Sequence, residues 1–218
     1  MFDFFYNFLG LNHQLFLLIN HGTNISILPY IFQIISWFFG ITHFAVYYII
    51  YCVYIYIKLI KIQNHDQFLI SFWSYYNKLA KAGITYTIFG LTYSVLKFSV
   101  NLPRPFCSLA GQDFVTVANT AAERCLSSFP SSHTGLALLI AYFVWPELSI
   151  KQKIAAILVV MLVAISRITL AMHYPADIIY SCFIATIVII ISNLFYKFLT
   201  NNIAKIIGGF ILRVLKPI

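Results

Sequence analysis

Two basic residues near the middle of the chain, Lys97 and Arg104, have the types and spacing of an anion site. A lysine ammonium offers a phosphate group a point charge, and an arginine guanidinium offers a planar fork that matches two phosphate oxygens. Pro103 and Pro105 exclude a regular helix around the arginine, so we expect it on a stiff, extended turn. The alternative is that both cations only extend toward water at a membrane surface.

A second cluster is the sequence Phe-Pro-Ser-Ser-His at residues 129–133. The proline is typical of a helix start, and Ser131 and Ser132 can cap the helix that follows. Backbone N–H groups in a first helical turn have no partners within the helix, so they bind anions readily, and His133 stands in that turn. Ordinary helix capping beside an interfacial histidine is the alternative interpretation.

A third cluster contains Arg167, His173 and Asp177. A charge within an apolar run is costly unless it faces a polar cavity or a partner, so Arg167 needs such a site. His173 and Asp177 are four residues apart. The carboxylate can therefore fix the imidazole tautomer and leave the other ring nitrogen free as a nucleophile or base. Pro175 lies between them, so this pairing can occur across a helix break. The alternative is an ion pair of Arg167 with Asp177.

Together, the three clusters provide the groups for phosphoryl transfer without a metal. The cations can bind phosphate oxygens, one histidine can attack phosphorus, and the other can protonate the leaving oxygen. No set of histidine, cysteine, aspartate and glutamate has convincing metal-ligand spacing, so we expect neither a metal nor another cofactor.

The composition predicts that membrane helices position these clusters. The chain has 218 residues, of which 61% are hydrophobic and only 9% are charged. A soluble domain of this length could not hide so much apolar surface from water. The net charge is +8, but the basic residues stand at the ends of apolar runs rather than in stripes with aromatic residues. We therefore do not expect a nucleic acid partner.

Five apolar runs are long enough to cross a bilayer as helices. They are residues 34–57, 80–100, 133–149, 154–172 and 177–198. Residues 1–25 form an interfacial helix or a short sixth span. We favour the interfacial helix because polar residues interrupt the segment. Residues 199–218 resemble an amphipathic cytoplasmic tail. We thus predict a single-domain (residues 1–218), all-α membrane bundle of five to six transmembrane helices with interfacial helices.

The distribution of basic residues predicts which face carries the clusters. Ten of the fourteen fall on one side, which is cytoplasmic by the positive-inside rule. These ten are Lys58, Lys61, Lys78, Lys81, Lys151, Lys153, Lys197, Lys205, Arg213 and Lys216. The other four, which are Lys97, Arg104, Arg124 and Arg167, fall on the opposite face, where the rule predicts few. They need another reason to exist, and a shared phosphate pocket provides one.

The order and spacing of the clusters resemble the three-part signature of the type 2 phosphatidic acid phosphatase family, which is related to vanadium haloperoxidases and bacterial acid phosphatases. The resemblance covers residues 97–177 directly. It implies that His173 is a nucleophile that forms a phosphohistidine, that Asp177 orients it, and that His133 protonates the leaving group.

The same resemblance implies a set of phosphate-binding residues, namely Lys97, Arg104, Arg167, Ser131 and Ser132. Ser132 stands where the family most often has glycine. Its side chain adds bulk beside the phosphate, at the position of the expected backbone contact, and serine is small enough for an active enzyme.

The resemblance predicts a lipid-phosphate phosphatase in a bacterial inner membrane, with its site on the periplasmic face. Its partners would be the bilayer and a phospholipid or glycolipid phosphate. Family substrates include phosphatidylglycerophosphate, phosphatidic acid, undecaprenyl diphosphate and lipid A phosphates, and the sequence does not select among them or define an oligomeric state.

Two other functions compete with hydrolysis. A lipid phosphotransferase would use the same site with a second lipid as the acceptor. A small transporter or ion relay built on Arg167, His173 and Asp177 is less favoured, because the polar residues gather at one face rather than at the midplane.

The long outer loop, residues 101–132, contains Cys107 and Cys125. In an oxidising periplasm they can form a disulfide, and separate free thiols are the alternative. The same loop contains Glu123, for which we expect a solvated side chain.

Overall fold

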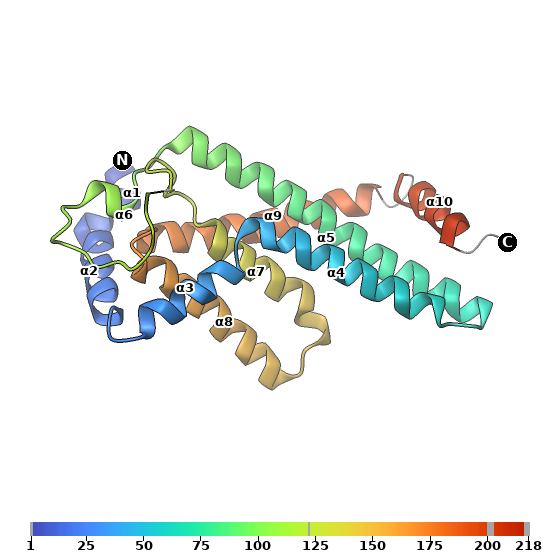
Figure 1. The fold of residues 1–218 in the computed structure, drawn as a ribbon. Helices are drawn as coiled ribbons and strands as arrows, with labels where there is room; N and C mark the ends of the chain where they lie inside the picture. The colour runs from blue at the N-terminus through green and yellow to red at the C-terminus, as the bar shows by residue number, and fades with distance from the viewer. Residues whose placement is uncertain (1, 122, 200–202, 216–218) are drawn as a thin grey trace. The chain divides into compact units, whose positions relative to one another are not determined.

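The computed structural model describes residues 2–121, 123–199 and 203–215. Over these ranges the chain is helical without any strand (Figure 1), which confirms the predicted all-α fold class. The helices form two compact units. The first contains Met1–Ile41 and Leu91–Thr186, and the second contains Thr42–Gly90 and Ile187–Ile218.

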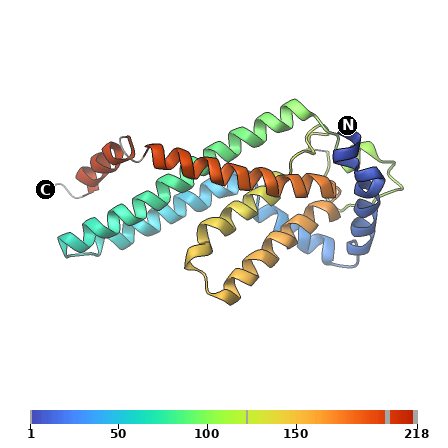
Figure 2. The ribbon, with the colours of Figure 1, turned by 180° about the vertical axis from the view of Figure 1, so that it is seen from behind.

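The first unit contains all three polar clusters. Its elements are α1 (Phe2–Asn7), the 3-10 turn η1 (Phe8–Gly10), α2 (Leu11–Thr23), α3 (Leu28–Phe38), the C-terminal part of α5 (His65–Val100), α6 (Pro105–Ser108), α7 (Ser132–Val144), the 3-10 turn η2 (Trp145–Glu147), α8 (Ile150–Thr169) and the N-terminal part of α9 (Pro175–Leu199). Helix α8 packs against α2, α3 and α7. Both views show α7 and α8 running side by side in opposite directions (Figures 1 and 2).

Helix α8 begins and ends for clear local reasons. At its start, Ser149 and Gln152 form a capping box that satisfies exposed N–H groups. Its final turn is buried, and Val163 and Ile168 lie in the core. Beyond the helix the chain turns through Ala171, whose φ of 55° is in the left-handed region. This turn brings the third cluster back toward the end of α8.

The predicted span at 34–57 is wrong in its boundaries. The structure breaks the apolar run, because α3 ends at Phe38 and α4 (Ile41–Ile60) begins three residues later. The break contains Gly40, a poor helix former that a hydrophobicity count does not penalise. The apolar run is therefore divided between two helices.

The N-terminal segment is also broken. At η1 the chain turns through Leu9 and Gly10, whose φ angles are 58° and 91°. The second angle is one that glycine adopts readily. Asn12 and Asn20 are buried in α2. Asn20 donates to Val115 and Thr169 carbonyls at 2.8 and 2.9 Å. Asn12, which accepts from the Ala176 amide at 2.9 Å, and Asn20 therefore bind other parts of the unit.

Among the described residues, three helices are long and apolar enough to cross a membrane, namely α4, α8 and α9. The segments Phe4–Thr23 and Leu28–Phe38 meet at 113° and would make a fourth as one broken span. The predicted spans at 154–172 and 177–198 match α8 and α9 closely. Helix α7 has only 13 residues, because η2 ends it before residue 149. A total of five to six spans stays a prediction.

The second unit contains most of α4, the N-terminal part of α5, the C-terminal part of α9 and α10 (Lys205–Leu215). Its core contains Ile55, Leu59, Phe68 and Phe72. Gly208 of α10 lies so close to Trp73 that an added Cβ would come within 2.6 Å of the indole. The amphipathic tail expected at 199–218 is thus a helix at 205–215, and residues 200–202 and 216–218 lie outside the described chain.

Candidate active site

The three clusters lie at helix ends in the first unit. Lys97 is in the last turn of α5, and Arg104 precedes α6 with an extended backbone (φ −74°, ψ 155°). His133 is in the first turn of α7, and Arg167 is in the last turn of α8. Asp177 is in the first turn of α9. Residues that are far apart in sequence therefore approach one another at the ends of different helices.

Ser127 joins the two cations of the first cluster. The Lys97 ammonium donates to the Ser127 carbonyl at 2.7 Å. The Arg104 guanidinium donates to the Ser127 hydroxyl through Nη2 at 3.1 Å and Nε at 3.3 Å. The extended backbone at Arg104 agrees with the turn expected from its flanking prolines. Both cations therefore reach one serine, which the sequence analysis did not identify.

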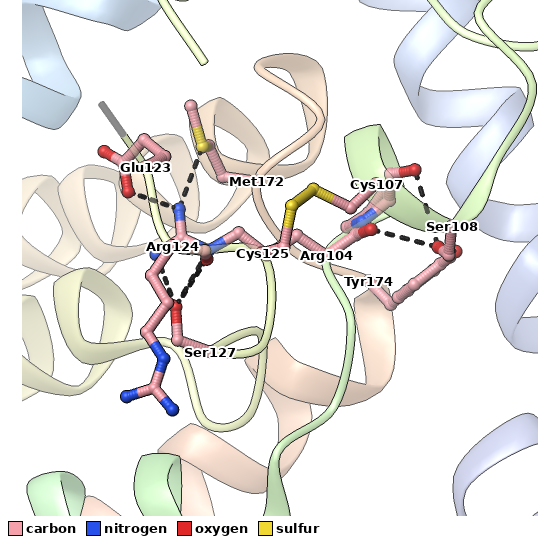
Figure 3. Close-up of a disulfide and its surroundings, with 10 residues drawn as sticks. Arg104, Cys107, Ser108, Glu123, Arg124, Cys125, Ser127, Met172 and Tyr174 are labelled. Carbon is pink, nitrogen blue, oxygen red and sulfur yellow. Dashed lines mark hydrogen bonds and ion pairs between the residues drawn. A yellow bond between two sulfur atoms is a disulfide. The ribbon is translucent and has the colours of Figure 1, made fainter. Parts of the chain in front are cut away.

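Arg104 is buried and has a carboxylate partner. Its Nη1 lies 2.7 Å from Glu123 Oε2 and 3.1 Å from the Met172 sulfur (Figure 3). Burial lowers the pKa of the Arg104 guanidinium, and the Glu123 carboxylate opposes that shift. The expectation that Glu123 is only solvated is therefore wrong. The two residues are close in space because the outer loop folds back over Arg104.

A disulfide between Cys107 and Cys125 fixes this part of the loop (Figure 3). Their Cα atoms are 5.7 Å apart, within the usual range for such a bond. The Arg104 amide also donates to the Cys125 carbonyl at 2.9 Å. The structure thus has the disulfide rather than two free thiols, and it joins α6 to the segment that leads into α7.

The second cluster begins α7 without a side-chain cap. Ser131 occupies the N-cap position, but its hydroxyl pairs with the Thr134 hydroxyl at 3.1 Å rather than with a backbone N–H. The Ser131 amide donates to the Asp177 carbonyl at 3.4 Å. Ser132 is half-buried in the first turn and, within the described chain, forms no hydrogen bond to the other predicted site residues. Side-chain capping by these serines, the alternative to an anion site, is therefore not observed.

Arg167 is buried at the end of α8, with 5% of its surface exposed. Its Nη1 donates to the Ser36 hydroxyl of α3, and in the described part of the chain its Nε has no hydrogen-bond partner. Within the described chain it forms no ion pair with Asp177. The structural ion pair considered for this cluster is therefore not observed, and Arg167 keeps a buried N–H for another acceptor.

His173 is fully buried, and neither ring nitrogen has a hydrogen-bond partner among the residues that the structure describes. Its Nδ1 lies 3.5 Å from Asp177 Oδ2, near enough for a charge contact but long for a hydrogen bond. Its pKa lies well below 6.5, first because of burial and then because of the charges of Lys97, Arg167, Arg104 and His133. The imidazole is therefore neutral, which leaves one of its two nitrogens unprotonated and available to attack an electrophile.

Four of the predicted residues thus act electrostatically on His173, and Asp177 lies beside it. Asp177 receives hydrogen bonds from Tyr6 at 2.7 Å, from the Tyr174 amide at 2.8 Å and from the Ser128 hydroxyl. The sequence analysis did not identify Tyr6 or Ser128. Ser128 precedes the second cluster closely enough to have been suspected, whereas nothing in the sequence links Tyr6 with a residue 171 positions later.

The arrangement joins three cations, a neutral imidazole, a second histidine and a carboxylate in one buried region. The cations can neutralise an anionic group with several oxygens, and the imidazole can attack it. His173, Arg167 and Asp177 are almost fully buried.

Comparison with known proteins finds a family and a similar fold. A family model described as "PAP2 superfamily" matches residues 78–202. Among solved structures, the fold is similar to LpxE of Aquifex aeolicus, with a TM-score of 0.63 and 21% sequence identity. The similarity covers 84% of this chain and 94% of that one. No curated protein matches the chain.

Proposed function

The chain belongs to the PAP2 superfamily, and from this premise we propose that it removes a phosphate group from a membrane lipid through a covalent phosphohistidine, without a metal. The observation that carries the proposal is the environment of His173. This imidazole is buried, neutral and without hydrogen-bond partners, and the charges of three cations act on it. Such a group is suited to attack a dianion whose charge the cations neutralise.

The first step forms a bond between His173 and phosphorus. Nδ1 faces Asp177, so Nε2 is the attacking atom, and the bond from phosphorus to the lipid oxygen breaks. His133 supplies a proton to this oxygen, and the lipid leaves as an alcohol. Asp177 stabilises the positive charge that the imidazole gains when its second nitrogen becomes bonded to phosphorus.

The second step returns the enzyme to its starting state. His133, now neutral, takes a proton from a water molecule that attacks phosphorus. The bond between phosphorus and His173 breaks, and inorganic phosphate leaves. Lys97, Arg104 and Arg167 hold the phosphate oxygens through both steps, and their charges count most in the transition state, where they face the negative charge on these oxygens.

The substrate is a lipid phosphate or diphosphate monoester with its headgroup on the extracytoplasmic side of the inner membrane. The distribution of lysine and arginine between the predicted loops supports this side. The disulfide supports it as well, because disulfides persist in the periplasm and are rare in the cytosol.

The test is phosphate release from a panel of lipids by the purified chain in detergent, with His173→Ala as the variant and His13→Ala as its control. His13 is an exposed histidine of α2. We expect His173→Ala to lose turnover to near background and to yield no acid-labile phosphoenzyme, while His13→Ala stays active. Undiminished hydrolysis by His173→Ala would reject the nucleophile.

Two further measurements define the reaction class. Chelation by EDTA should leave the rate unchanged if no metal takes part. Transfer of labelled phosphate only to an added lipid, without free phosphate, would replace the hydrolase with a phosphotransferase that uses the same site.

A further inference from the structure

We propose that Tyr6 is a positioning residue of the active site: its hydroxyl holds the Asp177 carboxylate in the orientation that His173 requires. The inference rests on the proposed function of the site, and it assigns a role to the N-terminal helix α1. This helix lies outside the family match, which begins at residue 78. Nothing in the three sequence clusters indicates it.

The hydrogen bonds of Asp177 show what Tyr6 adds. Oδ2 receives the Tyr174 amide and the Ser128 hydroxyl, and it faces His173 Nδ1 at 3.5 Å. Oδ1 receives the Tyr6 hydroxyl at 2.7 Å. Tyr6 is the partner of that oxygen within the described chain. Both carboxylate oxygens therefore accept hydrogen bonds. Rotation about the Cβ–Cγ bond of Asp177 would break a hydrogen bond to each of them.

Several contacts besides this hydrogen bond hold α1 against the start of α9. The Tyr180 hydroxyl donates to the Phe5 carbonyl at 2.6 Å. The Tyr6 ring packs edge-on against Phe129, with ring centroids 6.3 Å apart. Both ribbon views show α1 beside the N-terminal end of α9 (Figures 1 and 2). These contacts fix the position of the Tyr6 hydroxyl, so its hydrogen bond to Asp177 is part of the packing of α1 against α9.

The chemistry makes this orientation important for turnover rather than for binding. Asp177 is fully buried, and its charge is useful only if one oxygen faces Nδ1 as the imidazole becomes positive. A neutral hydroxyl donor fixes the carboxylate and compensates for lost water without neutralising its charge. Removal of the hydroxyl leaves Oδ1 unsatisfied and lets the carboxylate turn away from His173. Phosphate binding by the three cations does not depend on Tyr6.

The experiment compares Tyr6→Phe with Tyr180→Phe in the purified full-length chain, with short-chain phosphatidic acid in detergent micelles as the probe. Both variants delete one tyrosine hydroxyl between α1 and α9, but only Tyr6 reaches Asp177. We expect Tyr6→Phe to lower kcat about ten- to a hundredfold, the effect of one hydrogen bond to a charged group, with KM within about twofold. Tyr180→Phe should keep kcat within about twofold.

A second measurement separates positioning from a general structural role. In an Asp177→Asn background, Tyr6→Phe should cause no further loss of kcat, because its effect passes through the carboxylate. Additive losses in the double variant, or equal losses in Tyr6→Phe and Tyr180→Phe, would overturn the inference, as would wild-type kcat in Tyr6→Phe. These results presuppose an active wild-type enzyme. Absence of hydrolysis by the wild-type chain on every lipid phosphate would instead overturn the proposed function, and this inference with it.

Discussion

The ion pair between Arg104 and Glu123 predicts that a single substitution improves substrate affinity. Arg104 is a proposed phosphate ligand, yet its Nη1 already lies 2.7 Å from the Glu123 carboxylate. The incoming phosphate must displace this carboxylate to reach the same N–H group. Glu123→Gln keeps the size of the side chain and removes the competing charge, so we expect KM to fall.

The exposure of Arg104 and Glu123 determines how large a fall in KM we expect. Only 8% of the Arg104 side chain is exposed, but 38% of Glu123 is, so water screens the pair substantially. The full cost of breaking a buried pair, about 3–5 kcal/mol, therefore does not apply. An exposed pair contributes up to about 1 kcal/mol. We take about 1 kcal/mol, which corresponds to a fall in KM of about fivefold, with kcat within about twofold.

The assay is steady-state release of phosphate from short-chain phosphatidic acid at fixed micelle composition. Asp113→Asn is the matched control, because it removes the same charge from an exposed position in the same loop. Its KM should stay near that of the wild type. An unchanged or raised KM in Glu123→Gln would refute the competition. An equal fall in both variants would show only a general effect of loop charge on an anionic substrate.

Two further predictions concern the loop disulfide and the charge around His173. Replacing Cys107 and Cys125 by serine opens a closed loop with a sequence separation of 18. This double variant should lower the free energy of unfolding by about 3 kcal/mol, measured as a fall in Tm. Cys52→Ser is the control, and a double variant with the Tm of the wild type would contradict the prediction. Removing a neighbouring cation in Lys97→Met should raise the pKa of His173, because that cation disfavours the imidazolium. The acidic limb of the kcat/KM profile, where the nucleophile becomes protonated, should then move to higher pH; a limb that moves to lower pH would contradict the assignment.

The helical class and the three clusters could be predicted from the sequence because each depends on local information. Apolar runs indicate helices in lipid, and a proline followed by serines indicates the start of α7. The charges of Arg104, His133 and Arg167 are rare in such a chain, so their positions stand out. In the structure these residues act together on His173. To predict that they share one site, the sequence analysis also needed a membrane topology, which it inferred from the distribution of lysine and arginine.

The missed features depend on contacts that local patterns do not describe. Gly40 lies within a continuous apolar run, so only the structure shows that α3 and α4 are separate helices. Glu123 looked solvated because it lies in the long outer loop, whereas its partner is 19 residues earlier. Tyr6 is one of 15 tyrosines, and its importance follows only from where α1 packs.

The turn after α8 joins His173, the proposed nucleophile, to Arg167, a proposed phosphate ligand, through the backbone. The Arg167 carbonyl accepts hydrogen bonds from the Met172 amide at 3.0 Å and the His173 amide at 3.2 Å. The backbones of Arg167 and His173 therefore belong to one hydrogen-bonded ring, so the two residues move together when α8 tilts. Lys97 and Arg104 come from other segments and can shift against this ring. Changes in lipid chain length should thus alter how tightly a headgroup is held more than how fast its phosphorus is attacked.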